Sequence, residues 1–354
     1  MKLVTFLPRS DVQGTPRFGV LLADGQTVAE LQVGVIAMSG SASPYLNDML
    51  SWLDGGEQAF EQTQRVVEFI TNQLPPRATH PLDSLSLLAP VPRPRSIRDC
   101  IAFEKHIVQA TRTVTKWRFA PLAALDACVE KVRGRAFIGA PKVWYERPLY
   151  YKSNPFSVIG PEAEVCWPKY TDKLDYELEF GVFIGREGRD IPRERARKHI
   201  AGYTIFNDFS ARDIQLREMQ GRLGPAKGKD FDTGNVMGPY LITADEIPDP
   251  YNLTMVARIN GEEWSRGTSG DMYFTFEDII TYISQDETLY PGEFIGSGTV
   301  GNGCGLELDR WLKPGDVIEL EVESLGILRN RVVRPAPDAV GNGGLEHSPG
   351  REGP

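Results

Sequence analysis

Short apolar runs separated by tight turns dominate the chain beyond residue 96, and this rhythm is the strongest constraint on its fold. Turn dipeptides stand at Asn260-Gly261, Pro291-Gly292 and Pro314-Gly315. The stretch KPGDVIELEVESLGILRNRVV then predicts a closing pair of long strands. Strands without regularly alternating helices favour a mixed β-sandwich or roll over repeated βαβ units. We therefore expect an α+β protein that is predominantly β.

The first 90 residues have a different character. KLVTFLP and RFGVLLADGQTVAEL predict short strands, with a hairpin turn at Asp24-Gly25, and apolar residues then recur at helical spacing between Pro44 and Leu74. The proline-rich LLAPVPRPRS reads as a linker. We expect a small N-terminal α/β domain over 1–90, a main domain over 91–334, and a flexible Gly- and Pro-rich tail over 335–354.

Composition excludes several classes of partner. The 354 residues are 41% hydrophobic and 25% charged, which is ordinary for a globular protein, and the net charge is −9. An acidic chain is a poor ligand for nucleic acid or an anionic membrane. No apolar run approaches the roughly 20 residues of a membrane span, and the start lacks a signal core, so we expect a cytoplasmic protein. Four scattered cysteines indicate free thiols rather than a zinc site.

One predicted strand, LDYELEFGVFIG over 174–185, carries acidic residues at alternate positions. Since side chains alternate with period two, one face holds apolar groups and the other holds Asp175, Glu177 and Glu179. Two like charges about 4 Å apart repel by about 4 kcal/mol at a typical protein dielectric. That face is therefore either open to water or covered by something positive.

A further acid follows at a suitable distance. TIFNDFSARDIQ predicts a strand that turns into a helix, and it offers Asp208, with Arg212 and Gln215 one helical turn apart. Together with Glu177 and Glu179, Asp208 makes an oxygen-only set that suits Mg²⁺ or Mn²⁺ better than zinc. From spacing alone, a solvated strand face remains the alternative.

The segment SIRDCIAFEKHIVQATR, 96–112, contains a candidate base. Ser96 and Asp99 resemble a capping box, which predicts a helix that places Asp99 and His106 on one face, seven residues apart. His106 could accept a proton if a carboxylate from elsewhere orients it, whereas a purely structural histidine is the alternative. His347 falls in the predicted tail.

Two glycine-rich loops complete the candidate set. GPAKGKDFDTGNVMGP contains Lys229 but lacks the spacing of a phosphate loop, so it suits a carboxylate or keto oxygen. GEFIGSGTVGNGCGLEL holds Thr299 and ends near Glu307. Either loop could instead be a surface turn.

These pieces, in this order, resemble the fumarylacetoacetate hydrolase family. The resemblance covers Ile97 to Val333 and rests on RDxxAFEKH, DYELEFGVFIG, FNDFSARDIQ, GKDFDTGNVMGP, GSGTVGNG and the closing strand pair. It implies a mixed β-sandwich roll around a divalent cation, with a smaller N-terminal domain and a homodimeric assembly.

The resemblance also implies roles for single residues. The metal carboxylates fall on Glu177, Glu179 and Asp208, and Asp99 matches a position that some members add as another ligand. The catalytic residues fall on His106 as general base, Glu307 as the carboxylate that orients it, and Lys229. The substrate-binding residues fall on Tyr151, its neighbour Lys152, Arg212, Gln215 and Thr299.

One departure bears on the substrate. Fumarylacetoacetases read DFY where this chain reads Asp99-Cys100-Ile101, so the tyrosine contact is missing. This argues against fumarylacetoacetate itself as the substrate.

The expected function is hydrolysis of a C–C bond in an acylpyruvate, a β-diketo acid. The cation would chelate the α-keto acid, Lys229, Arg212 and Gln215 would stabilise the developing enolate, and His106 would activate water. Decarboxylation of oxaloacetate-like acids and keto–enol isomerisation pass through the same enolate and are alternatives. A non-catalytic cation-binding scaffold is a further alternative. The only partner expected besides a second subunit is a small oxo-acid.

Overall fold

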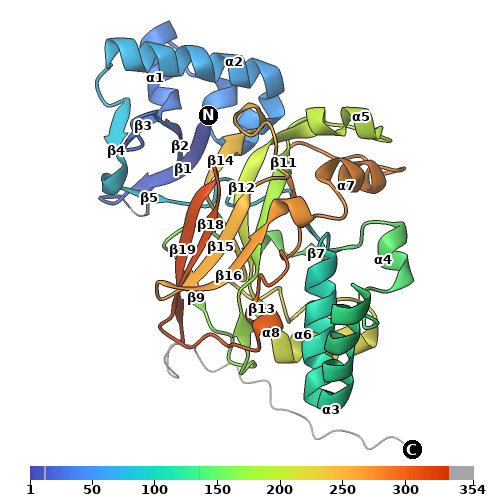
Figure 1. Ribbon diagram of the computed structural model, residues 1–354. Coiled ribbons are helices and arrows are strands. Elements are labelled where there is room, and N and C mark those ends of the chain that lie inside the picture. Colours follow the sequence, from blue (N-terminus) through green and yellow to red (C-terminus); the bar gives the residue numbers. More distant parts are fainter. Residues whose placement is uncertain (12, 135, 335–354) are drawn as a thin grey trace, which may run out of the picture.

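The computed structural model describes residues 1–11, 13–134 and 136–334 (Figure 1). The predicted tail over 335–354, with His347, lies outside the described residues. Strands form one large sheet, a second sheet of five strands and a short pair, with helices around them. This arrangement is the α+β fold that the sequence predicted. Among the described residues, no helix is both long enough and apolar enough to cross a membrane.

The large sheet has the strand order β4-β3-β2-β1-β14-β12-β11-β17-β6-β7, with β5 and β8 paired beside it. Its strands are β1 (Lys2–Pro8), β2 (Arg17–Leu21), β3 (Thr27–Glu30), β4 (Thr79–Pro81), β5 (Leu85–Leu87), β6 (Ser96–Cys100), β7 (Tyr150–Ser153), β8 (Val158–Ile159), β11 (Leu178–Ile184), β12 (Ile200–Asp208), β14 (Asn235–Thr243) and β17 (Glu293–Gly296). The four strands β12, β11, β17 and β6 lie side by side and carry most of the acidic candidates.

The second sheet has the order β16-β15-β18-β19-β9. Its strands are β9 (Glu164–Cys166), β15 (Thr254–Ile259), β16 (Glu262–Thr268), β18 (Val317–Val322) and β19 (Gly326–Val333). The closing pair β18 and β19 is the antiparallel hairpin that the sequence predicted. The short strands β10 (Leu174–Asp175) and β13 (Ser210–Ala211) pair only with each other.

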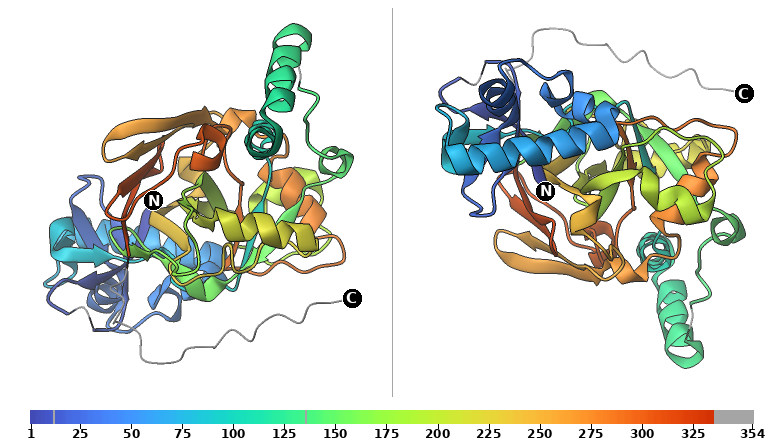
Figure 2. Two further views of the ribbon diagram at one scale, coloured as in Figure 1. Left: turned by 90° about the horizontal axis from the view of Figure 1, so that it is seen from below. Right: turned by 90° about the horizontal axis from the view of Figure 1, so that it is seen from above.

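Helices occupy the ends and edges of the sheets (Figure 1). They are α1 (Leu31–Ser39), α2 (Met49–Gln73), α3 (Glu104–Arg133), α4 (Lys142–Glu146), α5 (Arg193–Ala196), α6 (Arg212–Glu218), α7 (Phe276–Ile283) and α8 (Gly305–Leu308). Helices α1 and α2 lie beside the N-terminal strands. Helix α3 projects from the rest of the molecule in both views of Figure 2.

The N-terminal segment confirms the predicted hairpin and helix. Strands β2 and β3 flank Asp24-Gly25, where the Asp24 carboxylate accepts the backbone N–H groups of Gln26 and Thr27. Strand β1 also pairs antiparallel with β14, so the N-terminal strands extend the sheet of the main domain. The division into domains at residue 90 remains a proposal, and the two segments share one sheet.

The alternation predicted for 174–185 is confirmed. Tyr176, Leu178 and Phe180 are buried in the apolar core between the two sheets, where Phe180 packs edge-on against Phe276 at a ring distance of 5.2 Å. The acidic residues between them consequently point to the opposite face. That face is buried rather than solvated, which removes the alternative of an exposed charged strand.

The predicted helix over 96–112 is wrong in its first half. Residues Ser96–Cys100 form β6, which pairs parallel with β17 and antiparallel with β7, and α3 starts only at Glu104. The capping-box pattern of Ser96 and Asp99 is a local signal, and two flanking strands outweigh it. Asp99 and His106 therefore do not share a helix face. Asp99 lies on a sheet next to the other acids.

Close approach of neighbouring strands constrains Gly181 on β11. A Cβ atom at this position would lie 2.2 Å from Phe294 Cζ and 2.7 Å from the Ile295 carbonyl oxygen. We expect Gly181→Ala to lower the free energy of unfolding by about 2 kcal/mol through overpacking. Urea unfolding measures this loss, with Gly139→Ala as the control because no atom lies within 4 Å of its added Cβ. Equal stability of both variants would contradict the close packing of β11 on β17.

Candidate active site

Three carboxylates from three strands of the large sheet meet in the interior. Asp99 comes from β6, Glu179 from β11 and Asp208 from β12, and one oxygen of each lies within 4.8 Å of the others. Strand β17 runs between β6 and β11, and its Gly296 makes the approach feasible, because a Cβ there would lie 2.3 Å from Asp99 Oδ1. The sheet itself therefore assembles the cluster.

Each of these carboxylates has an oxygen with no hydrogen-bond donor among the described residues. The three oxygens are Asp99 Oδ1, Glu179 Oε2 and Asp208 Oδ1, and all are fully buried. Burial, together with the neighbouring carboxylates, raises the pKa of Asp99 and of Glu179 well above their usual values. Burial also raises the pKa of Asp208 to about 6.

An oxygen-only set with unsatisfied buried anions is the donor chemistry of a hard divalent cation. A cation would supply the positive charge that these three oxygens lack, so the residues fit the group that the resemblance implies. Asp99, the optional ligand in the sequence analysis, lies inside this cluster rather than beside it.

Glu177 lies next to the cluster but already has two cationic partners. Arg212 Nη2 donates to one oxygen at 2.7 Å, and Lys229 Nζ donates to the other. Burial opposes ionisation of Glu177, but the two cations outweigh it and hold its pKa well below the usual range. Lys229 also donates to Asp208. To act as a metal ligand, Glu177 would have to share its oxygens between these two side chains and the metal. Its ligand role remains a proposal.

Asp175, the third acid of the predicted strand, has a structural partner that the sequence did not reveal. It accepts a hydrogen bond from Arg212 Nε at 2.8 Å and the backbone N–H groups of Gly305 and Leu306, the first turn of α8. Arg212 in turn donates to Gln215 Oε1 at 2.9 Å. Asp175 thus ties α6 to α8. The only sequence signal for it was its place on the acidic face.

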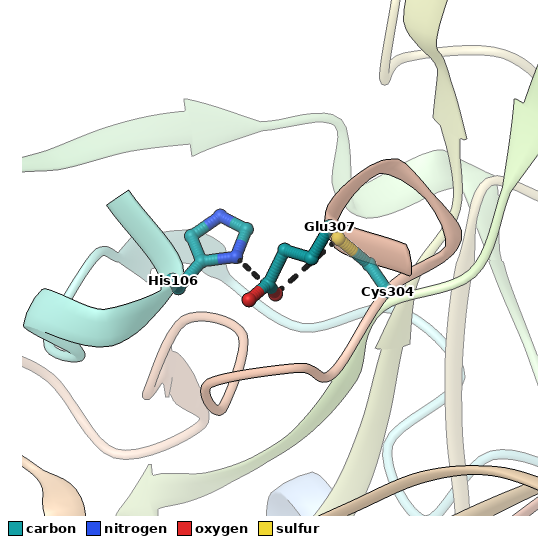
Figure 3. A group of neighbouring side chains, drawn as sticks. All are labelled: His106, Cys304 and Glu307. Carbon is teal, nitrogen blue, oxygen red and sulfur yellow. Dashed lines mark hydrogen bonds and ion pairs between the residues drawn. The ribbon is translucent and has the colours of Figure 1, made fainter. Parts of the chain in front are cut away.

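His106, at the start of α3, forms a pair with Glu307 of α8 (Figure 3). The distance from His106 Nδ1 to Glu307 Oε1 is 2.8 Å. The Glu307 side chain is fully buried and accepts the backbone N–H groups of Asn302 and Gly303 at 2.7 and 3.1 Å. When Nδ1 donates its proton to this carboxylate, Nε2 is left as a proton acceptor.

Figure 3 places the Glu307 carboxylate between the imidazole and the thiol of Cys304. Cys304 Sγ lies 3.5 Å from Glu307 Oε1 and donates a weak hydrogen bond to it. Burial raises the pKa of this thiol well above its usual value, so Cys304 remains a neutral donor. The carboxylate partner that the sequence analysis required for His106 is thus in place, 201 residues away along the chain.

One cavity of about 400 Å³ joins these groups. His106, Glu179, Arg212, Gln215, Lys229 and Thr299 are among the residues that line it. Thr299 Oγ1 donates to Glu179 at 3.1 Å, and the Tyr151 hydroxyl donates to Asp208. Burial raises the pKa of Tyr151 well above its usual value, so its hydroxyl remains a donor. Polar, acidic and basic candidates from the sequence analysis therefore surround a single space.

Lys152 is the one predicted substrate-binding residue that the structure does not bring to this space. It follows Tyr151 on β7, where alternation turns it to the other face, and it is exposed. It is not among the described residues that line the cavity. The resemblance transferred its role from its position beside Tyr151 alone.

Substitutions of Tyr151 and of its neighbour Lys152 should have different effects on kcat/KM. Tyr151→Phe removes the hydroxyl donor to Asp208, and we expect kcat/KM to fall about tenfold, as for loss of one buried hydrogen bond to a charged group. Lys152→Ala should leave kcat/KM within about twofold, as for a surface substitution. Steady-state kinetics on both variants measures this, and a comparable loss in the two would show that Lys152 reaches the substrate.

Comparison with known proteins is consistent with this geometry. A family model for the C-terminal part of fumarylacetoacetate hydrolase matches residues 123–333. The human protein named oxaloacetate tautomerase FAHD2A, mitochondrial, is 33% identical over 301 residues, covering 85% of this chain and 84% of the human one. The chain belongs to the fumarylacetoacetate hydrolase family. It is accordingly an enzyme of that family.

Solved structures agree on the fold. A probable 2-hydroxyhepta-2,4-diene-1,7-dioate isomerase from Mycobacterium abscessus is 27% identical with a TM-score of 0.66, covering 95% of this chain and all of the other. The fumarylacetoacetate hydrolase from Exiguobacterium antarcticum, at 24% identity and a TM-score of 0.69 with the same coverage, shows the fold alone. Family members therefore include proteins named as hydrolases, isomerases and tautomerases.

Proposed function

We propose that this enzyme hydrolyses a C–C bond in a small acylpyruvate-like β-diketo acid. The observation that carries the proposal is the His106–Glu307 pair, because His106 lines the same cavity as Asp99 and Glu179 of the carboxylate cluster. A buried carboxylate that fixes one ring nitrogen of a histidine is the arrangement of a general base. Hydrolysis is the reaction in this family that needs such a base for water.

The cluster of Asp99, Glu179 and Asp208, with Glu177 beside it, would hold Mg²⁺ or Mn²⁺. The cation supplies Lewis-acid chemistry to the oxygens of a 2-oxo acid. Carboxylate oxygens suit both ions, and the set contains no sulfur or nitrogen that would select zinc.

The side chains then act on the proton and the developing charge. His106 Nε2 takes the proton of a water molecule, and Glu307 stabilises the imidazolium that forms. Attack of that water on the distal carbonyl, followed by cleavage of the C–C bond, leaves the electron pair on the enolate of the pyruvate fragment. Lys229 and Arg212 place positive charge at this end of the cavity, which stabilises the enolate.

A second candidate is keto–enol tautomerisation of oxaloacetate. It is favoured by the human relative at 33% identity, which is named an oxaloacetate tautomerase. In that reaction a base moves a proton between carbon and oxygen, and no water attacks. Decarboxylation of an oxaloacetate-like acid uses the same enolate and also needs no activated water.

One assay separates these candidates. Purified protein with Mg²⁺ or Mn²⁺ is incubated in parallel with acetylpyruvate, fumarylpyruvate and oxaloacetate, and the release of acid, the decay of enol absorbance and CO₂ are recorded. Cleavage of an acylpyruvate to pyruvate and a carboxylic acid is expected. Enol–keto conversion of oxaloacetate without cleavage of any acylpyruvate would overturn the hydrolase in favour of the tautomerase, and CO₂ release alone would indicate a decarboxylase.

A homodimer and a cytoplasmic location also belong to the proposal. The homodimer rests on the family resemblance, and the cytoplasmic location stays a prediction, since the human relative is named as mitochondrial. Light scattering of the purified protein measures the assembly, and a mass of one chain, 39.4 kDa, would contradict the dimer.

A further inference from the structure

Two chemically different sets of residues line the candidate cavity, its polar wall and its apolar wall. One is the polar wall of carboxylates, His106, Arg212 and Lys229 described above. The other is apolar and contains Ile101, Ile107, Pro141, Trp144, Leu149 and Met219. The polar wall would bind the 2-oxo acid end of a substrate, whereas the apolar wall has no role in the steps described above.

The apolar wall is held in place by its own contacts. Trp144 is fully buried, and its Nε1 donates to the Ile101 carbonyl at 2.5 Å, while the Ile101 N–H donates to the Leu149 carbonyl at 3.1 Å. The indole of Trp144 packs against the ring of Tyr273 at 4.8 Å and that of Phe274 at 5.8 Å. A wall fixed in this way is organised before a ligand arrives, which lowers the entropic cost of binding.

The basic side chains that line the cavity, among the described residues, are all paired with acids. Arg212 bonds to Asp175 and Glu177, and Lys229 bonds to Glu177 and Asp208. His106 bonds to Glu307. A second carboxylate at the distal end of a substrate would meet the apolar wall with no free cation, and burying an unpaired charge is costly.

We propose that the substrate is a 2-oxo acid whose distal acyl group is uncharged and apolar, alkyl or aryl, and that dicarboxylates are poor substrates. This inference rests on the proposed hydrolase and adds the class of its acyl group. Burial of a group of several carbons against Ile101, Trp144 and Leu149 provides the preference, since apolar area removed from water is favourable. Fumarylpyruvate and oxaloacetate both carry the second carboxylate that this wall does not accommodate.

Met219 provides a variant that can weaken the preference for an apolar acyl group without disturbing the core. It lies one turn beyond Gln215 at the end of α6, it lines the cavity, and it is 52% exposed. An arginine at this position can keep its charge hydrated and still reach a distal carboxylate. Met219→Leu is the matched control because it keeps the size and the apolar character.

The test compares kcat/KM for benzoylpyruvate, acetylpyruvate and fumarylpyruvate in the wild type and both variants. In the wild type we expect benzoylpyruvate to exceed fumarylpyruvate by at least about tenfold, as for a pocket that leaves a charge unpaired. Met219→Arg should narrow this ratio by about fivefold through a partly exposed ion pair, whereas Met219→Leu should leave it unchanged.

The outcomes separate this inference from the proposed function. Cleavage of all three acylpyruvates with fumarylpyruvate equal to or better than benzoylpyruvate would overturn the inference and leave the hydrolase standing. Cleavage of none would overturn the hydrolase. In that case calorimetric binding of phenylpyruvate and of oxaloacetate, each with Mg²⁺, still tests the wall: tighter binding of phenylpyruvate supports its apolar selectivity, and tighter binding of oxaloacetate overturns it.

Discussion

The variant His106→Ala is expected to lower kcat for acylpyruvate hydrolysis by about a thousandfold, within the range that a positioned general base contributes. The reason lies in the geometry of one pair. The Glu307 side chain is fully buried and accepts two backbone N–H groups, so it fixes His106 Nδ1 and leaves Nε2 as the proton acceptor. Alanine removes the proton acceptor and leaves the carboxylate cluster intact. Stopped and continuous assays of acid release give kcat.

His199→Ala is the matched control, because the His199 side chain, among the described residues, bonds to the Arg186 carbonyl and does not line the cavity. Glu307→Gln provides a second arm: the amide keeps the size of the side chain but cannot stabilise the imidazolium, so a loss of about a hundredfold or more is expected. Full hydrolytic activity in His106→Ala would exclude water activation by this histidine. Loss of hydrolysis with unchanged oxaloacetate decarboxylation would show that the enolate chemistry does not depend on it.

The variant Glu179→Gln should remove both the activity and the stabilisation by a divalent cation. In the wild type, saturating Mg²⁺ or Mn²⁺ at about 100 times Kd is expected to add about 2.7 kcal/mol of stability, which raises Tm by about 4 °C. Glu179 supplies one of the three buried oxygens without a donor, so its amide variant loses a ligand. The thermal shift should then be close to zero.

The same variant should be at least as stable as the wild type when the cation is removed with EDTA. Burial and the neighbouring Asp99, Glu177 and Asp208 raise the pKa of Glu179 well above its usual value, which means that its charge is unfavourable in the folded protein. A neutral amide of the same shape removes that cost. Glu164→Gln, an exposed acid on β9, is the control and should keep the full shift. A Glu179→Gln protein that still responds to Mg²⁺ would contradict the proposed ligand set.

Much of the fold could be predicted because its signals are local. The alternation in 174–185, the hairpin at Asp24-Gly25 and the closing hairpin of β18 and β19 all depend on neighbours within a few residues. The strand-to-helix change at Arg212 is of the same kind. The structure confirms each of them, since burial on one face and turn chemistry act over the same short range as the pattern.

The predicted secondary structure was wrong where strands distant in the sequence determine the conformation of a segment. The segment Ser96–Cys100 carries a helix-start signal, yet it forms a strand, because it pairs with β17 on one edge and with β7 on the other. The roles of single residues relied on the resemblance and stay predictions. For Lys152 the assigned role came from its neighbour Tyr151, and strand alternation turns the Lys152 side chain to the other face.

The sequence by itself determined the residue types of the site: an oxygen-only acidic set, a histidine and a lysine within predicted strands and loops. Only the tertiary structure determined which of these side chains contact one another. It brought Asp99 into the carboxylate cluster, paired Glu177 with Arg212 and Lys229, and placed Glu307, the partner that the resemblance implied, within 2.8 Å of His106. The physical reason is that charges interact through space with the partners that packing places beside them, whereas periodicity along the chain specifies only which face each one occupies.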